Sequence, residues 1–568
     1  MMTSTTSSIR FMGSLLAGGR AGSPAADPIA NGVPRERGQV RGGPQPTSQS
    51  LRWVSYEAVT PDRPRPYPRT DSAAGTLLAT VPAKATPRGA TIPSMRPGFL
   101  ILLSPVFAPL AAAQSGVPAS NSTPPTEVEP WRLKAALDLP AWLTLSGTQR
   151  TRFEYLDGQF RADSASKIYD DSDHLFALRT TLRADVRLDS FVATAELMDA
   201  RQYEADAGSA LDTTTVNAAE FVQAFAGYEG QGLVQDGDKT TAIVGRHTMD
   251  LGNRRLVARN DFRNTTNNFD GLNLLWESAS KSTLRAFYTL PVWRLPTDEA
   301  SLLDNDVELD ESTRHVQFWG LYGTLAELVP TLQAELYWLE LDEQDSAGLP
   351  TADRDLTTLG LRSLRKPAMG EFDFELESAW QFGSSHSNTT SAAELDHDAR
   401  FHHLEAGYTF DASWKPRLAL QYDLATGDDS PTDGENNRFD TLFGARRWEF
   451  GPTGIFGALA RANVVSPGWR VTANPTDALD LMFAHRFAYL ESDTDAYTPG
   501  NVRDPSGNSG DEVGQLVEFR ARWNVLSGNF SLDFGVAHLF AGEFLDHAPN
   551  ATGNGDTNYV YLQTLLSF

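Results

Sequence analysis

Arginine recurs at every second or fourth position in several short stretches of the chain. Its guanidinium group presents a planar fork of N–H donors, which matches the two oxygens of a carboxylate. A row of such forks is suited to binding an anionic ligand at several points in succession. The arginines concerned are Arg150, Arg152, Arg179, Arg183, Arg187, Arg520 and Arg522, and Arg246 stands singly in another such stretch.

Each of these stretches is a segment in which apolar and polar residues alternate. In HLFALRTTLRADVRL, Leu178 and Leu182 fall on one face and Arg179 falls on the other. Residues 371–382, EFDFELESAWQF, repeat the pattern with carboxylates on the polar face. A period of two predicts β-strands that have one apolar and one polar face.

We count eighteen such runs between residues 142 and 568. Their connections alternate in length: DGQFRADSASKIYDDSD is followed by DS, and a forty-residue excursion from Gly427 is followed by PTD. This predicts an all-β protein, a transmembrane antiparallel β-barrel of about 18 strands with short periplasmic turns and long extracellular loops. A soluble β-sandwich would also alternate, but the regular order of long and short connections would then be accidental. No run of eighteen apolar residues occurs, which excludes a transmembrane helix.

The last residues, NYVYLQTLLSF, form another alternating run. Leu562, Leu566 and Phe568 share its apolar face, which we expect to contact lipid. In a closed barrel the last strand pairs with the first, so no strand edge is left unpaired in hydrocarbon. We therefore expect the barrel to span residues 142–568.

The polar faces carry about as many carboxylates as arginines, so charge count alone does not identify an anion channel. Arginines concentrate on the first two runs and on residues 513–525, whereas residues 371–382 carry an acidic row. One interpretation is a track of guanidinium groups that binds and releases anionic sugars in turn. The other is that the arginines pair with carboxylates of the wall and merely fill the lumen.

The loop from Gly252 to Phe269 is a second candidate site, because it is basic while the other long loops are acidic. Folded inward, it would constrict the lumen. At the rim, it would bind the phosphates of lipopolysaccharide. Its arginines are Arg254, Arg255, Arg259 and Arg263.

Other chemistries have little support. The chain has no cysteine, which removes thiolate metal sites and cysteine nucleophiles, and its formal charge of -25 argues against nucleic-acid binding. The acidic loop 428–440 has calcium-ligand residue types near the required spacing, but Pro431 occupies a ligand position. We expect no cofactor and at most adventitious calcium there. No nucleophile and base stand in a catalytic pattern, so we expect no enzyme, with a barrel hydrolase as a remote alternative.

Residues 95–113 have the form of a secretory signal peptide. Met95 and Arg96 precede an apolar stretch that ends in the small residues Ala111 and Ala113. Residues 1–94 are rich in Pro, Gly, Arg and Ser and show no apolar period. We expect them to be a mis-called start, with translation beginning at Met95, or a disordered extension. Residues 114–141 would then form a linker.

Three stretches resemble the alginate export family of outer-membrane channels. The first is VGRHTMDLGNRRLVARNDFRNTTNNFDGLNLLW, in which His247 stands where that family usually has Gln. The second is LALQYDLATGDDSPTDGENNRFDTLFGARRW, and the third, VGQLVEFRARWNVLSGNFSLDFGVAHLFAGEFL, looks like the penultimate hairpin. The matching residues are Gly245, Arg246, Gly252, Arg254, Arg255, Leu256, Phe269, Asp270 and Gly271, then Gly427, Asp428, Phe439, Asp440, Leu442 and Phe443, then Gly514, Gly535 and Gly542.

The resemblance implies a passive channel in the cell outer membrane of a Gram-negative bacterium, which exports an anionic polysaccharide such as alginate or a similar polyuronate. The arginine rows, with Arg246, Arg254 and Arg255, would line its path. Expected partners are outer-membrane lipid, lipopolysaccharide and the outer-membrane assembly machinery, since Phe568 resembles the terminal aromatic signal that this machinery reads. A substrate-selective uptake porin for small anions or sugars is the alternative.

Overall fold

The computed structural model describes residues 129–346, 348–430 and 432–568. The expected extension 1–94 and signal peptide 95–113 lie outside the described residues, as does the expected linker up to residue 128. In the part of the chain that is described, no helix is long and apolar enough to cross a membrane.

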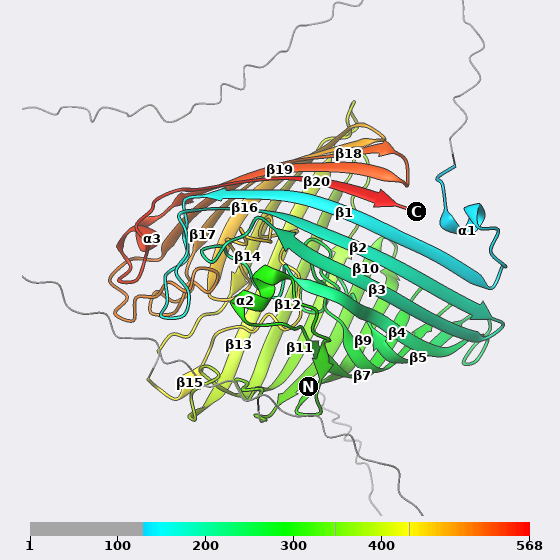
Figure 1. Cartoon of the computed structure of the whole chain (residues 1–568), viewed down its shortest axis with the longest axis horizontal. Helices are drawn as coiled ribbons and strands as arrows, with labels where there is room; N and C mark the ends of the chain where they lie inside the picture. The colour runs from blue at the N-terminus through cyan, green and yellow to red at the C-terminus, as the bar shows by residue number, and fades with distance from the viewer. Residues whose placement is uncertain (1–128, 347, 431) are drawn as a thin grey trace, which may run out of the picture. The chain divides into compact units, whose positions relative to one another are not determined.

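Eighteen long antiparallel strands form a wall that closes on itself, because β1 pairs with β2 on one side and with β20 on the other (Figure 1). This confirms the expected fold class. The wall strands are β1 (Leu143–Asp157), β2 (Ser172–Leu188), β3 (Phe191–Tyr203), β4 (Asn217–Gln231), β5 (Lys239–His247), β6 (Phe269–Glu277), β7 (Thr283–Trp293), β9 (Val316–Val329), β10 (Leu332–Glu343), β11 (Asp355–Arg365), β12 (Phe372–His386), β13 (Glu394–Thr409), β14 (Arg417–Ala425), β16 (Val464–Thr476), β17 (Leu479–Tyr489), β18 (Glu512–Leu526), β19 (Phe530–Ala541) and β20 (Thr557–Ser567). The described residues outside the wall include β8 (Glu311–Ser312), β15 (Glu435–Asn436), α1 (Leu133–Ala136), α2 (Glu299–Asp304) and α3 (Glu543–His547).

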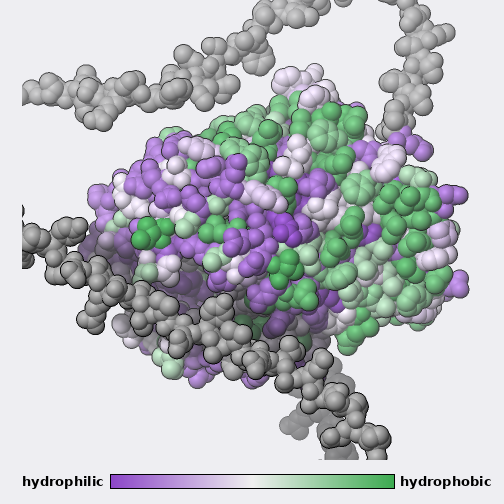
Figure 2. Space-filling model, viewed as in Figure 1, coloured by the Kyte–Doolittle hydropathy of each residue, from purple (hydrophilic) through white to green (hydrophobic). Residues whose placement is uncertain are grey.

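The alternation read from the sequence has the expected orientation. In β20, Leu562 and Leu566 are 50% and 45% exposed on the outer face, whereas Tyr559 and Tyr561 are buried on the inner face. Large apolar side chains gather on an exposed surface where the surroundings are themselves apolar, so the outer face is the lipid-facing one. Figure 2 shows apolar residues over the wall strands and polar residues over the end formed by the long loops.

The connections divide between the two ends of the barrel, with long loops at one end and short turns at the other. In outer-membrane barrels the loop end is extracellular and the turn end periplasmic. We call the pairing of β1 with β20, which closes the barrel, the seam. There the N–H of Gly147 donates to the carbonyl of Phe568 (2.9 Å), and the N–H of Phe568 donates to the carbonyl of Gly147 (3.0 Å). The loops are 158–171, 204–216, 248–268, 294–315, 344–354, 387–393, 426–463, 490–511 and 542–556.

Two of the long loops fold into the barrel and fill the middle of its lumen. We call residues 248–268 and 437–463 the loop layer. The two segments meet through paired backbone at Val257 and Phe443, and Phe456 of the second segment is fully buried. Of the two placements expected for the basic loop, the structure shows the inward one.

The residues ahead of β1 lie against the turn between β18 and β19. The side chain of Asn529 accepts a hydrogen bond from the N–H of Trp131 (2.7 Å) and donates to the carbonyls of Trp131 (2.8 Å) and Ser567 (2.7 Å). The last part of the expected linker is therefore attached to the periplasmic rim beside the seam.

Candidate functional site

Aromatic residues from two of the three motif stretches pack together inside the lumen. Phe269, at the start of β6, is fully buried, and its ring centroid lies 5.3 Å from that of Phe443 in the loop layer. Both rings also contact Phe318 of β9, at 6.1 and 4.9 Å. Such aromatic pairs prefer particular orientations, which fixes the segments that carry them. Phe439 packs in the same way on Phe401 of β13, at 5.5 Å.

The first motif stretch also fixes the strands on which the basic loop starts and ends. Arg246 of β5 stands opposite Asp270 of β6, and its guanidinium lies 2.8 Å from that carboxylate and 2.8 Å from Glu220 of β4. Gly245 and Gly271 are also a register pair. A Cβ at these two positions would lie 2.4 and 2.2 Å from a backbone carbonyl oxygen of the neighbouring strand, so only glycine fits there.

The second motif stretch joins extracellular loops to one another. The N–H groups of Gly427 and Asp428 donate to carboxylates in loop 490–511, both at 3.0 Å. The side chain of Asp440 accepts from the N–H of Leu442 (2.7 Å) and pairs with Arg354 at 2.7 Å. These contacts set the path of the chain into the loop layer.

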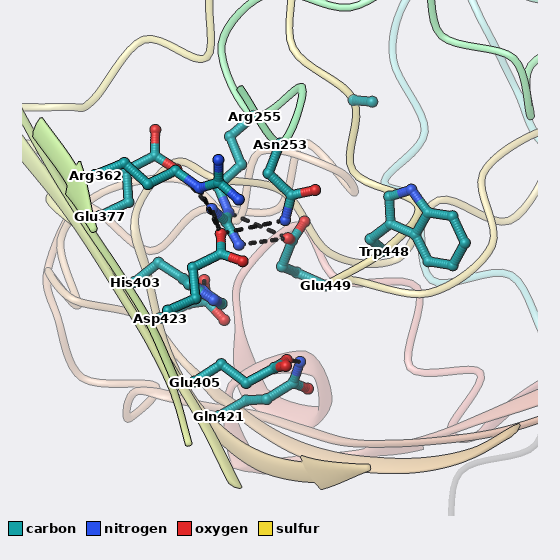
Figure 3. Close-up of polar contacts among 12 residues, drawn as sticks. Asn253, Arg255, Arg362, Glu377, His403, Glu405, Gln421, Asp423, Trp448 and Glu449 are labelled. Carbon is teal, nitrogen blue, oxygen red and sulfur yellow. Dashed lines mark hydrogen bonds and ion pairs between the residues drawn. The ribbon is translucent and has the colours of Figure 1, made fainter. Parts of the chain in front are cut away.

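Arg255 is the centre of a buried ion network in the middle of the lumen (Figure 3). The chain enters this part of the loop layer at Gly252, where φ is +51°. Arg255 is 2% exposed, and it pairs with Glu375 and Glu377 of the acidic row on β12 and with Glu449 of the other loop at 3.0 Å. A buried charge is tolerated when it is paired in this way. Arg255 therefore ties both segments of the loop layer to the acidic wall.

Most arginines of the rows named from the sequence have carboxylate partners. The pairs are Arg152–Glu154 (2.7 Å), Arg183–Asp185 (2.8 Å), Arg187–Glu229 (3.2 Å), Arg520–Asp533 and Arg522–Asp533 (3.5 Å), and Arg254 of the basic loop lies 4.0 Å from Asp261. Arg150 and Arg179 differ, because among the described residues they have no carboxylate at ion-pair distance and donate only to neutral acceptors of the loop layer. Pairing within the wall leaves few free guanidinium groups on the rows themselves.

A cavity of about 610 Å³ lies on the extracellular side of the loop layer. Five arginines line it, and two of them, Arg354 and Arg438, pair with carboxylates. The other three, Arg263, Arg294 and Arg446, have no carboxylate within ion-pair distance in the described part of the chain. We call these three residues the outer arginine cluster.

The positive charge of this cluster is poorly compensated. Arg263 and Arg294 share one acceptor, the Oδ1 of Asn267, at 2.7 and 2.9 Å. Burial and the charge of Arg294 hold the pKa of Arg263 well below its ordinary value, and burial together with Arg161 lowers the pKa of Arg446. Arginine stays protonated near neutral pH, so each of these buried groups carries a positive charge that no carboxylate at ion-pair distance balances in the described chain. A carboxylate in the cavity would supply it.

A second lumenal cavity, of about 320 Å³, lies on the periplasmic side of the loop layer. Trp448 of the loop layer lines it together with four arginines of the wall, Arg417, Arg470, Arg520 and Arg522. The ion pair of Arg470 with Glu405 is 3.9 Å long, and Arg470 also donates to the carbonyl of Trp448. Both sides of the loop layer therefore present guanidinium groups.

Two further features bear on metal binding and catalysis: the acidic loop 428–440 and His403, which neighbours His402 on β13. Among residues 129–568, with the two gaps noted above, no group of three or more His, Cys, Asp or Glu is placed to hold a metal ion. The Nδ1 of His403 lies 2.7 Å from Asp423, but Asp423 also pairs with Arg486. His403 and Asp423 therefore belong to the ion network around Arg255. The carboxylates of this network raise the pKa of Arg255.

The sequence shows Arg263 as one of four arginines of the basic loop, but no pattern in it marks Arg161, Arg294 or Arg446. These residues lie in loops, where no period assigns a direction to a side chain. The available signal for Arg446 was the basic pair in GARRW, inside an otherwise acidic loop.

A closed barrel with an apolar outer face, a charged lumen and inward-folded loops is an outer-membrane channel. The family model for alginate export matches residues 141–557, and the chain belongs to that family. No curated protein matches the chain. The solved structures to which it is similar at low identity include three outer-membrane proteins. They are OccK8 (OprE) of Pseudomonas aeruginosa (11% identity, 75% of this chain and 98% of that chain, TM-score 0.48), OpdL of Pseudomonas aeruginosa (13%, 76% and 99%, 0.49) and OccAB2 of Acinetobacter baumannii (13%, 75% and 98%, 0.48).

Proposed function

We propose that the channel exports an anionic polysaccharide, with alginate or a similar polyuronate as the substrate class. The observation that carries the proposal is the outer arginine cluster, Arg263, Arg294 and Arg446, which lines the extracellular cavity without carboxylate partners in the described chain. Each uronate unit brings a carboxylate, which a guanidinium binds through two parallel hydrogen bonds.

The arrangement on the two sides of the loop layer supports passage of a polymer. Arg470 and Arg522 on the periplasmic side and the outer arginine cluster on the other offer successive binding points. A channel conducts when each site binds firmly enough to admit its substrate and weakly enough to release it. The positive potential of these cavities would also raise the local concentration of a polyanion.

A substrate-selective uptake porin for small anions or sugars is the second candidate. It is favoured by the size of the two cavities, about 610 and 320 Å³, which is typical of sites for small ligands. The loop layer that lies between them would admit a small molecule with less displacement than a polymer. A barrel hydrolase stays a remote alternative.

Single-channel recording in planar bilayers tests the proposal. Polyuronate oligosaccharides should block the current, and neutral dextran of equal length should not. Replacing Arg263 and Arg446 by glutamine should weaken the block about tenfold or more, because each removed charge-assisted hydrogen bond contributes about 1.5–3 kcal/mol. Lys281→Gln removes one positive charge from an exposed periplasmic turn and is the control for each single replacement.

The other outcomes separate the candidates. Block by small sugars or small anions alone supports the uptake porin. A closed lumen together with ester hydrolysis by the purified protein supports the hydrolase. Block that persists unchanged in the Arg263→Gln, Arg446→Gln variant would contradict the role of the outer arginine cluster.

A further inference from the structure

Two arginines at the centre of the wall are an exception to the pairing with carboxylates. Arg150 and Arg179 stand directly opposite each other on β1 and β2, and they are 2% and 9% exposed. Like charges placed opposite each other in a sheet repel, and buried charges are normally paired. Within the described chain neither has a carboxylate at ion-pair distance, and the Nε of each is buried without a hydrogen-bond partner.

A short segment of the loop layer supplies the acceptors for both guanidinium groups. Arg150 donates to the carbonyls of Asp261 (2.7 Å) and Arg263 (2.8 Å) and to the side chain of Asn264 (2.8 Å). Arg179 donates to the same carbonyls of Asp261 (3.3 Å) and Arg263 (3.2 Å). Arg152 donates to the carbonyl between them, that of Phe262 (2.5 Å), and the amide of Asn264 donates to the carbonyls of Leu178 (3.1 Å) and Arg201 (3.2 Å) of the wall. Residues 261–264 are therefore held against the wall by several anchors, two of which are buried positive charges without a carboxylate partner.

Neutral acceptors are a poor match for this pair. Each bond from a guanidinium to a loop carbonyl is already charge-assisted, but a carboxylate also matches the planar fork of arginine with two parallel hydrogen bonds. A carboxylate would also bring the negative charge that the two neighbouring guanidinium groups lack. The loop carbonyls thus occupy a position at which a carboxylate would bind more strongly.

Arg263 connects this position to the extracellular cavity. Its carbonyl oxygen holds Arg150 and Arg179, whereas its guanidinium lines the cavity beside Arg294 and Arg446. An anion that binds in the cavity therefore engages the side chain of the residue whose backbone holds the loop to the wall.

We propose that Arg150 and Arg179 form a second carboxylate-binding site, concealed beneath residues 261–264, and that a polyanionic substrate opens the lumen by displacing this segment from it. The inference rests on the proposed function, since it needs an anionic substrate. At rest the loop binds the two guanidinium groups through its own carbonyls. Uronate carboxylates take their place, and the freed loop moves out of the lumen.

The absence of cysteine from the chain allows a direct test. Thr265 follows the held segment and is fully buried. Its N–H donates to the carbonyl of Thr214 (3.1 Å) and its hydroxyl to that of Thr213 (2.9 Å), both in loop 204–216. Thr265→Cys therefore places a single thiol where a polar thiol reagent arrives only after the segment has moved away from the wall and from this loop. In the full-length protein reconstituted in liposomes, polyuronate should speed labelling about tenfold, the ratio expected for one lost charge-assisted bond. Neutral dextran at equal ionic strength should not change the rate.

Two sets of variants complete the test in the Thr265→Cys background. Arg150→Gln with Arg179→Gln should label faster without polyuronate than Thr265→Cys alone, because the loop has lost two of its anchors and keeps those from Arg152 and Asn264. Arg285→Gln is the matched control, since Arg285 also faces the lumen but donates to Asn273 of the neighbouring strand, and it should label slowly. Heat-dependent mobility in gels shows whether each barrel is folded. If the double variant does not fold, Arg150→Lys replaces it. This change keeps the positive charge but removes the planar guanidinium group, and the variant should still label faster than the control.

The outcomes distinguish this inference from the proposed function. If polyuronate blocks the current but leaves labelling slow, the concealed site is overturned and the proposed function stands. No block and no change in labelling would overturn both. Slow labelling of the folded anchor variants would overturn the concealed site whatever the substrate is.

Discussion

Individual arginines in the lumen differ in what compensates their charge, and this difference separates their roles. Arg255 contacts three carboxylates and Arg246 contacts two. Arg263 instead shares an amide oxygen with a second guanidinium. An arginine surrounded by carboxylates ties segments of the chain together, whereas one without them is available to an anionic ligand.

Replacing Arg255 by methionine should loosen the loop layer. The change removes one counter-ion from three buried carboxylates, which keep only Arg362 and Arg461 between them. Breaking one partner of a buried pair costs about 3–5 kcal/mol. Chymotrypsin, which cuts after aromatic residues such as Phe262, should then digest the loop of the folded barrel faster. Arg254→Met is the control, because Arg254 is partly exposed and lies 4.0 Å from its nearest ion-pair partner. Equal digestion rates for the two variants would contradict the assignment.

Asp310 should make the attachment of one extracellular loop depend on pH. Burial raises the pKa of this carboxyl to about 6, and the group accepts hydrogen bonds from Asn217 (2.8 Å) and from the N–H of Leu295 (3.0 Å). Because its pKa in the unfolded chain is about 3.9, the folded state binds the proton more tightly. The associated stability is therefore present below about pH 4 and is lost as the pH rises through about 6, with a full loss of about 3 kcal/mol.

Hydrogen exchange of loop 294–315 measures this effect. After correction for intrinsic exchange rates, protection in the wild-type loop should fall between about pH 4 and about pH 7. Asp310→Asn should flatten the profile, and Asp306→Asn, at an exposed position of the same loop, should keep the wild-type slope. A flat profile in the wild-type protein would refute the role of Asp310.

Among the elements, the two segments of the loop layer determine what the lumen can do. His247 and Phe269 are a register pair at the ends of β5 and β6, so a tight turn would suffice to join these strands. The chain instead inserts residues 248–268, whose Val257 and Thr265 are fully buried. Long loops that fold into a scaffold commonly carry its function, and here the insert lies between the two cationic cavities.

Replacing residues 248–268 by a short Gly-Ser turn should raise the single-channel conductance severalfold while leaving the wall intact. The wall strands pair with one another independently of the insert, since His247 still faces Phe269. The matched control replaces the exposed loop 387–393 in the same way, because His386 and Glu394 form the equivalent register pair on β12 and β13. Conductance that stays at the wild-type level in the first variant would show that the loop does not restrict the pore.

At the scale of the whole molecule, closure of the seam makes the sheet continuous and leaves no strand edge in the membrane. The last residue takes part in this closure, since Phe568 exchanges two backbone hydrogen bonds with Gly147. The role of Phe568 as a signal for the assembly machinery stays a prediction, as do the signal peptide and the contact with lipopolysaccharide.

A methyl group at Gly147 should weaken the seam. A Cβ there would lie 2.6 Å from the ring of Phe568 and 2.7 Å from the carbonyl oxygen of Thr181. Overpacking of this kind costs about 1–3 kcal/mol, so Gly147→Ala should lower the temperature at which the folded barrel loses its fast gel mobility. Gly323→Ala in β9, where the nearest atom would be 3.8 Å away, should leave that temperature unchanged. A variant at Gly147 as stable as the wild type would rule out tight packing at the seam.

The sequence by itself determined the wall. Because strand side chains alternate strictly between two faces, the pattern around Leu178 and Arg179 was enough to separate lipid-facing from lumen-facing residues. The order of long and short connections then gave the antiparallel barrel, its two ends and its seam. The motif residues pointed to the correct family, although their packing against one another, as in Phe269 and Phe443, was not visible.

Only the tertiary structure decided what the lumen contains. Loops have no period that assigns directions to side chains, so the inward fold of residues 248–268 was one of two possibilities, and the cavity around Arg263, Arg294 and Arg446 was not anticipated. Ion pairing depends on distances between residues far apart in sequence, such as Arg255 and Glu449. Which arginines are neutralised and which are free is therefore a property of the folded molecule, because Coulomb energy follows separation in space rather than along the chain.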